Sequence, residues 1–277
     1  MNNIIDISLR EDSVPYDSFN GLSKILDRFK TKITEDIIIK ELGVKILKVK
    51  VPSNLNKDAY YYNITNTKRL AKGTEAVLSP KIIRAMDYFL MDDFQKRLFA
   101  FGVFKSIQLI LRNTNKSIKN SCIVVDDANE RVVKEVIYEL AKNTKYLVLL
   151  SKDLKKSLRL RDYIISNYGI SPEVTWDDDY AYKIADFVVT TREQSYENKN
   201  IWYINNLYVP DKPSHIIVND ITFKVPWTMK EDEVSCELLG AILGQMGEKD
   251  IERSLNYNGI ILDNIKFNHS IVSVDNI

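Results

Sequence analysis

The sequence predicts an α/β protein of two domains, the second of which is built on a parallel sheet flanked by helices. From residue 122 onward, short apolar segments alternate with amphipathic helical segments, as strands and crossover helices do in parallel sheets. The first 120 residues mix helix and strand patterns without this alternation. A chain of 277 residues with 45% hydrophobic content can form two cores. We therefore expect an N-terminal mixed α/β domain over residues 1–118, and a second domain with C-terminal closing elements over residues 119–277.

The N-terminal domain shows four recognisable elements. Residues 4–9 have the pattern of a strand, and residues 18–29 that of a short amphipathic helix. Apolar and basic residues nearly alternate over residues 44–51, which is typical of a half-exposed strand. Residues 94–112 form the most hydrophobic helical segment of the chain, and because its apolar residues are distributed almost all round, we expect it to be buried.

The second domain begins with the apolar strand at residues 122–125. An amphipathic helix follows, with its apolar positions at Val132, Val133, Val136, Ile137 and Leu140. A second helix over residues 154–168 should end at Gly169, which can adopt the left-handed conformation that stops a helix. Further strands are predicted at residues 146–150, 173–176, 186–191 and 201–204. Strands joined in this way pair in parallel with right-handed crossovers, which predicts a Rossmann-like sheet.

Composition narrows the function classes. The net charge is +1, from 39 basic and 38 acidic residues, so no overall field attracts nucleic acid or an anionic membrane. Two cysteines and two histidines offer no zinc-binding spacing, and we expect no metal site. The cysteine content and the absence of a secretory leader pattern favour a cytoplasmic protein. The expected partner is a small-molecule substrate or another protein, and a homo-oligomer stays open.

The turn after the first strand of the second domain is unusual for a nucleotide-binding sheet. No glycine occurs between Gly102 and Gly169, and the turn reads Val-Asp-Asp-Ala-Asn-Glu over residues 125–130. In dinucleotide-binding domains glycines occupy this turn, because only a residue without Cβ lets the backbone approach a diphosphate at the helix N-terminus. Carboxylates stand here instead, which weakens the expected attraction for phosphate.

Three segments nevertheless resemble the NAD(P) domain of the shikimate-dehydrogenase and glutamyl-tRNA-reductase group. They are Cys122-Ile123-Val124-Val125, Tyr146-Leu147-Val148-Leu149-Leu150-Ser151-Lys152, and Ala185-Asp186-Phe187-Val188-Val189-Thr190-Thr191. The resemblance implies a degenerate Rossmann-fold dehydrogenase with NAD(P) as its candidate cofactor. It places Ser151, Lys152, Thr190 and Thr191 beside that cofactor, and Asp126, Asp127 and Asn129 where the family has its glycine-rich turn.

A second, shorter resemblance suggests catalytic residues. The segment Asn63-Ile64-Thr65-Asn66-Thr67-Lys68 is similar to the Asn-Val-Thr…Lys loop that carries the catalytic lysine of shikimate dehydrogenases, although the lysine comes one residue early and the family's proline is absent. Asp93 would stand where the partner aspartate stands. Such a pair can move a proton to or from a hydroxyl that loses hydride. The structural alternatives are an exposed loop position for Lys68 and an N-cap for Asp93.

Other interpretations of the acidic turn stay open. Asp127 and Glu130 have the spacing of a capping box for the following helix. Asp126 and Asp127 also resemble the paired acids of a phosphoacceptor receiver domain, which bind Mg²⁺ beside an aspartate that residues 177–179 would supply. For the whole chain two hypotheses remain: an NAD(P)-dependent oxidoreductase acting on a small metabolite, or a catalytically inactive Rossmann-like protein that is a binding or assembly partner.

Overall fold

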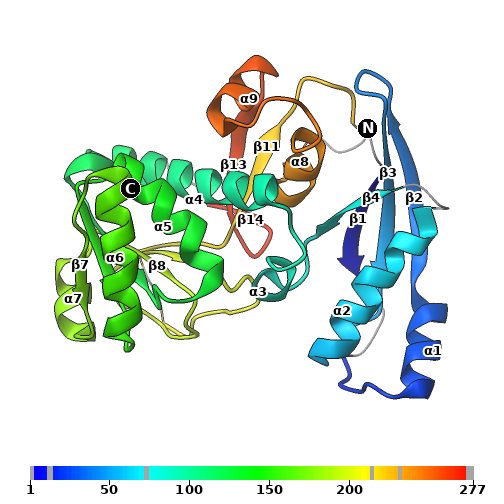
Figure 1. Cartoon of the computed structure of the whole chain (residues 1–277), viewed down its shortest axis with the longest axis horizontal. Helices are drawn as coiled ribbons and strands as arrows, with labels where there is room; N and C mark the ends of the chain where they lie inside the picture. The colour runs from blue at the N-terminus through cyan, green and yellow to red at the C-terminus, as the bar shows by residue number, and fades with distance from the viewer. Residues whose placement is uncertain (1–2, 11–14, 72–74, 213–214, 230–232, 273–277) are drawn as a thin grey trace. The chain divides into compact units, whose positions relative to one another are not determined.

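The computed structural model describes residues 3–10, 15–71, 75–212, 215–229 and 233–272. The chain folds into two compact units (Figure 1). Unit 1 comprises Met1–Gln95 and Lys224–Ile261, and unit 2 comprises Lys96–Phe223 and Leu262–Ile277. The domain boundary expected near residue 118 lies inside unit 2, since most of the long apolar helix belongs to that unit.

Unit 1 contains a mixed four-stranded sheet with the order β2-β3-β1-β4. Strand β1 pairs in parallel with β3 and β4, while β2 pairs antiparallel with β3. The elements of unit 1 are β1 (Asn3–Leu9), α1 (Gly21–Lys30), β2 (Lys32–Ile39), β3 (Val44–Val51), α2 (Lys57–Asn66), the 3₁₀ helix η1 (Thr67–Ala71), β4 (Ala76–Pro80), α3 (Arg84–Asp87), β12 (Val234–Ser235), α8 (Cys236–Leu243) and α9 (Ile251–Tyr257).

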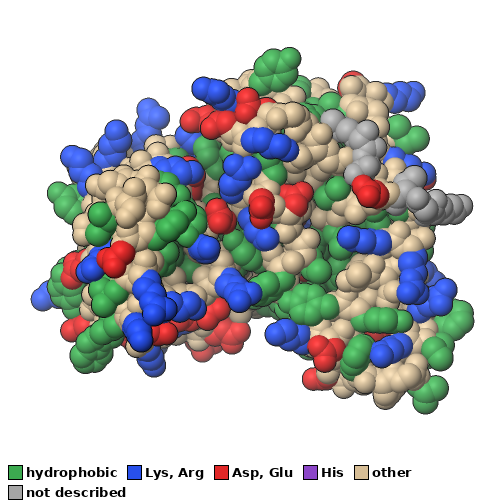
Figure 2. Space-filling view, viewed as in Figure 1, with side chains coloured by type: hydrophobic (Ala, Val, Ile, Leu, Met, Phe, Trp, Pro, Cys, Tyr) green, Lys and Arg blue, Asp and Glu red, His purple; other side chains and the backbone are tan. Residues whose placement is uncertain are grey.

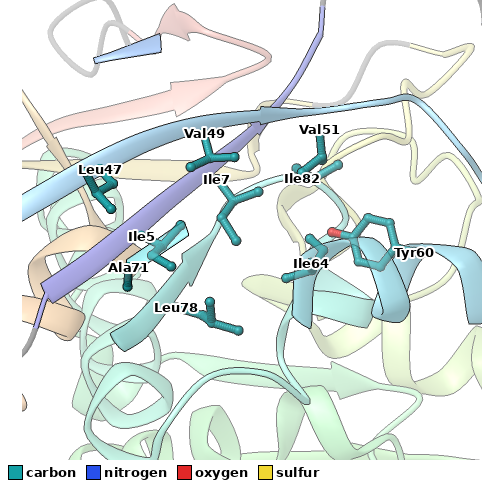
Figure 3. Packing of buried hydrophobic residues seen from close by; sticks show 10 residues of the cluster. All are labelled: Ile5, Ile7, Leu47, Val49, Val51, Tyr60, Ile64, Ala71, Leu78 and Ile82. Atoms are coloured by element: carbon teal, nitrogen blue, oxygen red, sulfur yellow. The ribbon is translucent and has the colours of Figure 1, made fainter. Parts of the chain in front are cut away.

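The core of unit 1 lies between this sheet and α2 (Figure 3). Alternate residues of a strand point to the same side of a sheet, so β1 and β3 each contribute every second side chain. The buried cluster consists of Ile5, Ile7, Leu47, Val49, Val51, Tyr60, Ile64, Ala71, Leu78 and Ile82. The predicted strands at residues 4–9 and 44–51 are thus confirmed as central strands of this sheet.

Unit 2 alternates strands and helices as predicted. Its elements are most of α4 (Asp93–Asn113), η2 (Ile118–Asn120), β5 (Cys122–Asp126), η3 (Arg131–Val133), α5 (Lys134–Asn143), β6 (Tyr146–Leu150), α6 (Leu154–Tyr168), β7 (Glu173–Thr175), α7 (Asp178–Ile184), β8 (Phe187–Thr190), β9 (Asn200–Tyr203), β10 (Ile216–Val218), β11 (Asp220–Lys224), β13 (Ile261–Phe267) and β14 (Ser270–Ile271). Helix α6 ends at Gly169 with φ 73°, as its sequence predicts.

The main sheet of unit 2 has six parallel strands in the order β10-β9-β8-β5-β6-β7. Counted from β5 as the first strand, this is the 3-2-1-4-5-6 order of the Rossmann fold. Strand β5 lies at the centre and pairs with β6 on one side and β8 on the other. The Rossmann-like α/β fold class is therefore confirmed by the strand order itself.

Both faces of this sheet are buried. One face packs its apolar side chains against α7, through Val124, Val188 and Ala181 among others. The opposite face includes Trp202, whose ring lies against Phe99 of α4 and whose Nε1 donates a hydrogen bond of 3.0 Å to Ser106 Oγ. Helices α5 and α6 lie side by side next to the sheet (Figure 1). In the described part of the chain, no helix is long and apolar enough to cross a membrane.

Candidate functional site

The candidate site is the carboxyl edge of the unit 2 sheet between β5 and β8. The chain leaves β5 toward β6 on one side, and β8 to β10 extend the sheet on the other. In open parallel sheets, ligands bind outside the carboxyl ends of the strands at this change of direction. Asp126 ends β5, Thr190 ends β8, and the two residues are paired in register.

The carboxylate of Asp126 is fully buried and is held by three hydroxyl groups. Its Oδ2 atom accepts hydrogen bonds from Tyr182 at 2.9 Å, from Thr190 at 3.2 Å and from Tyr196. Arg192 Nε lies 3.1 Å from Oδ1 as a charge partner, although no well-aligned hydrogen bond reaches that oxygen. Thr190 Oγ1 also contacts the Tyr196 hydroxyl at 2.9 Å, which closes the cluster.

The cluster balances burial against hydrogen bonding. Burial raises the pKa of the Asp126 carboxyl above its ordinary value, and the bonds from Tyr196, Tyr182 and Thr190 and the charge of Arg192 oppose that rise. Burial, followed by the nearby Asp126 charge, raises the pKa of the Tyr182 and Tyr196 hydroxyls. Both tyrosines therefore stay protonated and act as donors to Asp126.

The turn after β5 uses its own polar groups internally. Asp127 adopts a left-handed conformation with φ 63°, and its Oδ2 accepts a 3.1 Å hydrogen bond from Thr191 Oγ1. The Ala128 N–H donates to the Leu150 carbonyl at 3.1 Å, and the Glu130 N–H donates to the Asp127 carbonyl at 2.9 Å. The predicted capping box of Asp127 and Glu130 is wrong: α5 begins only at Lys134 after a 3₁₀ turn, and Glu130 makes no side-chain cap.

Asn129 connects this turn to the end of β6. Its Nδ2 donates to Ser151 Oγ at 2.6 Å, to the Asp153 carbonyl at 2.9 Å and to Ser157 Oγ at 2.9 Å. Both serines are buried. Asn129 thus joins the turn after β5 to the residues that follow β6, and Lys152 is exposed next to Ser151.

The structure brings together six of the seven residues that were predicted to border a cofactor. They form three bonded pairs across strand ends: Asp126 with Thr190, Asp127 with Thr191, and Asn129 with Ser151. Tyr182, Tyr196 and Arg192 belong to the same cluster and were not predicted from the sequence. Arg192 also pairs with Asp178 Oδ2 at 3.3 Å. Tyr182 comes from α7, and Arg192 and Tyr196 come from the loop after β8. Because these segments are distant from Asp126 in the sequence, no local pattern predicts that they contact it.

The two predicted catalytic residues lie in unit 1, and both are exposed. Lys68 lies on η1, while the preceding Asn63 is buried in α2 and donates to Asp27 Oδ2 at 2.7 Å. Asp93 lies in the first turn of α4. The cap of that helix is Asp92, whose Oδ1 accepts from the Gln95 N–H at 2.8 Å while Gln95 Oε1 accepts from the Asp92 N–H. Asp92, rather than Asp93, is therefore the N-cap of α4.

The acids of the receiver-like pattern are engaged in other roles. Asp177 caps α7 by accepting a 3.0 Å hydrogen bond from the Tyr180 N–H, and Asp178 pairs with Arg192. Within the residues that the structure describes, no group of three or more histidine, cysteine or acidic side chains is arranged to hold a metal ion.

The residues at the switch point do not fit a dinucleotide held by a glycine-rich turn. A buried carboxylate ends β5, and the Ala128 and Glu130 N–H groups of the following turn are already bonded within the protein. Asn129 occupies the end of β6 through three hydrogen bonds. A diphosphate at this place would meet two carboxylates and would have to displace these contacts.

No protein-family model matches the sequence, and no curated protein matches it. Among solved structures, the chain is similar to a shikimate dehydrogenase in complex with NADP⁺, with 12% identity, a TM-score of 0.38, and coverage of 74% of this chain and 76% of that one. It is also similar to quinate dehydrogenase from Corynebacterium glutamicum in complex with NAD, with 12% identity, a TM-score of 0.35, and coverage of 73% and 78%. For L-tryptophan dehydrogenase from Nostoc punctiforme, the identity is 10%, the TM-score 0.28, and the coverage 70% and 56%. These include the group that the strand ends resemble, and the likeness is one of fold alone.

Proposed function

We propose that this chain is a Rossmann-like protein that acts as a binding or assembly partner, without redox chemistry at the switch point of its sheet. The observation that supports this proposal is the buried Asp126 carboxylate, which three hydroxyl groups and Arg192 hold at the carboxyl end of β5, where a dinucleotide-binding sheet would receive a diphosphate. Fold alone does not imply the activity of other proteins that share it.

The energetic reason is electrostatic. A diphosphate within a few ångströms of Asp126 and Asp127 would be repelled by on the order of 1 to 4 kcal/mol per charge pair, depending on the local dielectric. Arg192 offers limited compensation, because it is already paired with Asp126 and Asp178. The cluster therefore favours the closed arrangement of its own side chains over a bound dinucleotide.

A cofactor titration tests the proposal. We expect NADH and NADPH, added to the full-length protein at about 1 mM, to leave the melting temperature unchanged, since a ligand raises it only if it binds the native state. Nicotinamide fluorescence should likewise show no saturable change. A saturable shift in both measurements would contradict the proposal and indicate a dinucleotide site.

An NAD(P)-dependent oxidoreductase is the second candidate. It is favoured by the Rossmann strand order together with the exposed Lys152 at the end of β6. In this candidate Ser151, Thr190 and Thr191 border the cofactor, and Lys68 and Asp93 are the proposed acid–base residues. If the titration shows binding, Lys152→Ala should weaken it at least tenfold, whereas Lys68→Ala should leave it unchanged. Equal binding by both variants and the parent protein would count against this placement of the cofactor.

A further inference from the structure

Helix α1 of unit 1 turns its apolar side outward. Leu22, Ile25, Leu26 and Phe29 are 75, 56, 55 and 76% exposed, and their spacing places them in one stripe along the helix. Figure 2 shows apolar side chains on the surface in the region of α1, with basic side chains beside them. An apolar stripe normally faces a core, so this arrangement points to a surface that is covered in the working protein.

The polar side of α1 holds the helix in this orientation. Asp27 is buried and accepts hydrogen bonds from Asn54 Nδ2 at 2.9 Å, from Asn63 Nδ2 at 2.7 Å and from the Tyr16 hydroxyl. Rotating the helix to bury its apolar stripe would leave these donors without their acceptor. Buried donors without an acceptor are costly, which opposes this rotation.

The helix start is fixed as well. Asn20 and Ser23 form a reciprocal capping box, with both bonds at 2.8 Å. Capping and the Asp27 cluster together make the outward stripe a defined feature of unit 1.

We propose that this stripe is a homodimer interface, in which α1 of a second copy packs antiparallel against α1. In a two-fold antiparallel pair, each residue of one helix faces a residue of the other at a constant sum of their numbers. With that sum at 51, Leu22 faces Phe29 of the second copy, and Ile25 faces Leu26. Each apolar residue of the stripe then faces an apolar residue of the second copy.

Charge favours the antiparallel direction. The exposed Asp17 lies before the amino end of α1, while the exposed Arg28 and Lys32 lie at or after its carboxyl part. The antiparallel arrangement brings the acidic end of each copy toward the basic end of the other, and it also sets the two helix dipoles in opposite directions. A parallel pair would place like charges together.

The size of the stripe sets the expected strength. Four apolar side chains exposed to this extent present on the order of 500 Å² of surface, below the ~800 Å² per partner of a standard interface. We therefore expect a reversible dimer in the micromolar range. This inference does not depend on whether unit 2 binds a dinucleotide, so the cofactor titration and the following experiment can fail independently.

Sedimentation equilibrium of the full chain from about 1 to 200 μM tests the dimer, because association makes the measured mass depend on protein concentration. Leu26→Glu should raise the dimer dissociation constant at least tenfold. The matched control is Tyr257→Glu, which changes a 91% exposed side chain of α9 in the same unit and should alter the constant less than twofold. Circular dichroism should show that both variants are folded.

A charge exchange tests the direction of the helices. Asp17→Arg alone should weaken the dimer severalfold, and Asp17→Arg with Lys32→Glu should restore most of the loss, because Lys32 is the exposed basic residue nearest to Asp17 of the second copy in this register. A mass that stays monomeric over the whole concentration range would overturn the proposal, as would a dimer that Leu26→Glu leaves intact. Co-sedimentation of a monomeric chain with phosphatidylserine vesicles that is lost in Leu26→Glu would also overturn it, and would assign the face to a lipid surface.

Discussion

Helices α1 and α5 are both ten residues long and both amphipathic, yet they bury opposite sides. Helix α5 of unit 2 buries Val136, Ile137 and Leu140. Helix α1 of unit 1 buries Ser23 and Asp27 and exposes its apolar stripe. A 3.6-residue period defines a helix and its stripe, but the side that becomes buried depends on what the neighbouring elements present to it.

The neighbours differ in chemistry. Beside α1 stand Asn54, Asn63 and Tyr16, whose donors need a buried acceptor, and Asp27 supplies it. Burial of polar groups is acceptable when each is hydrogen-bonded, and it becomes costly when one partner is lost. Helix α5 follows the central strand of a sheet that is buried on both faces, so its apolar side is the one that is covered.

The largest expected effect comes from placing a charge on each stripe. Ile137→Asp in α5 should lower the free energy of unfolding by more than about 4 kcal/mol, because it buries an unpaired carboxylate and removes core contacts. Leu26→Asp in α1 should change it by less than about 1 kcal/mol. Urea denaturation of both variants, at a concentration where the protein is monomeric, measures the difference. Similar losses in the two variants would mean that α1 buries its stripe.

The reciprocal change removes a polar group from the buried side of α1. Asp27→Ala should cost about 3 kcal/mol or more, since it leaves the donors of Asn54, Asn63 and Tyr16 unsatisfied. Lys142→Ala on the exposed side of α5 is the control and should cost less than about 0.5 kcal/mol. The same denaturation curves give both values. A near-neutral Asp27→Ala would show that the polar side of α1 does not fix its orientation.

A third test extends the comparison to pH, through another buried carboxylate of unit 1. Asp87 accepts hydrogen bonds from the Tyr60 hydroxyl and from the Ile82 N–H at 2.8 Å, and burial raises its pKa to about 6. The folded protein holds this proton more tightly than the unfolded chain. The contribution of Asp87 to the free energy of unfolding is therefore fully present below about pH 4 and is lost as the pH rises to about 6. The loss in unfolding free energy is up to about 3 kcal/mol.

Asp87→Asn removes this titration, so the parent protein and the variant should differ in how their stability changes between pH 4 and 6. The difference in unfolding free energy across that interval is the quantity to measure, because other carboxyl groups titrate equally in both proteins. Parallel pH profiles for the two proteins would show that the pKa of Asp87 is not raised by folding.

Local pattern predicted most of unit 2 and less of unit 1. The strands β5 to β9 and the helix ending at Gly169 follow from apolar runs and a helix stop. Strand β2 and helix α2 were not predicted. Helix α2 has weak amphipathic character despite its buried Tyr60 and Ile64, so its sequence carries no clear period.

The candidate site was also predicted only in part from the sequence. The sequence by itself determined that acidic and amide side chains, and no glycine, stand at the end of β5 and in the turn after it, and that Thr190 ends the neighbouring strand. Only the tertiary structure decided that Asp126 is buried by Tyr182 and Tyr196, which stand 56 and 70 residues away along the chain. It also decided that α1 exposes its apolar stripe. Periodicity arises from backbone geometry over a few residues, whereas these pairings depend on which distant elements pack together.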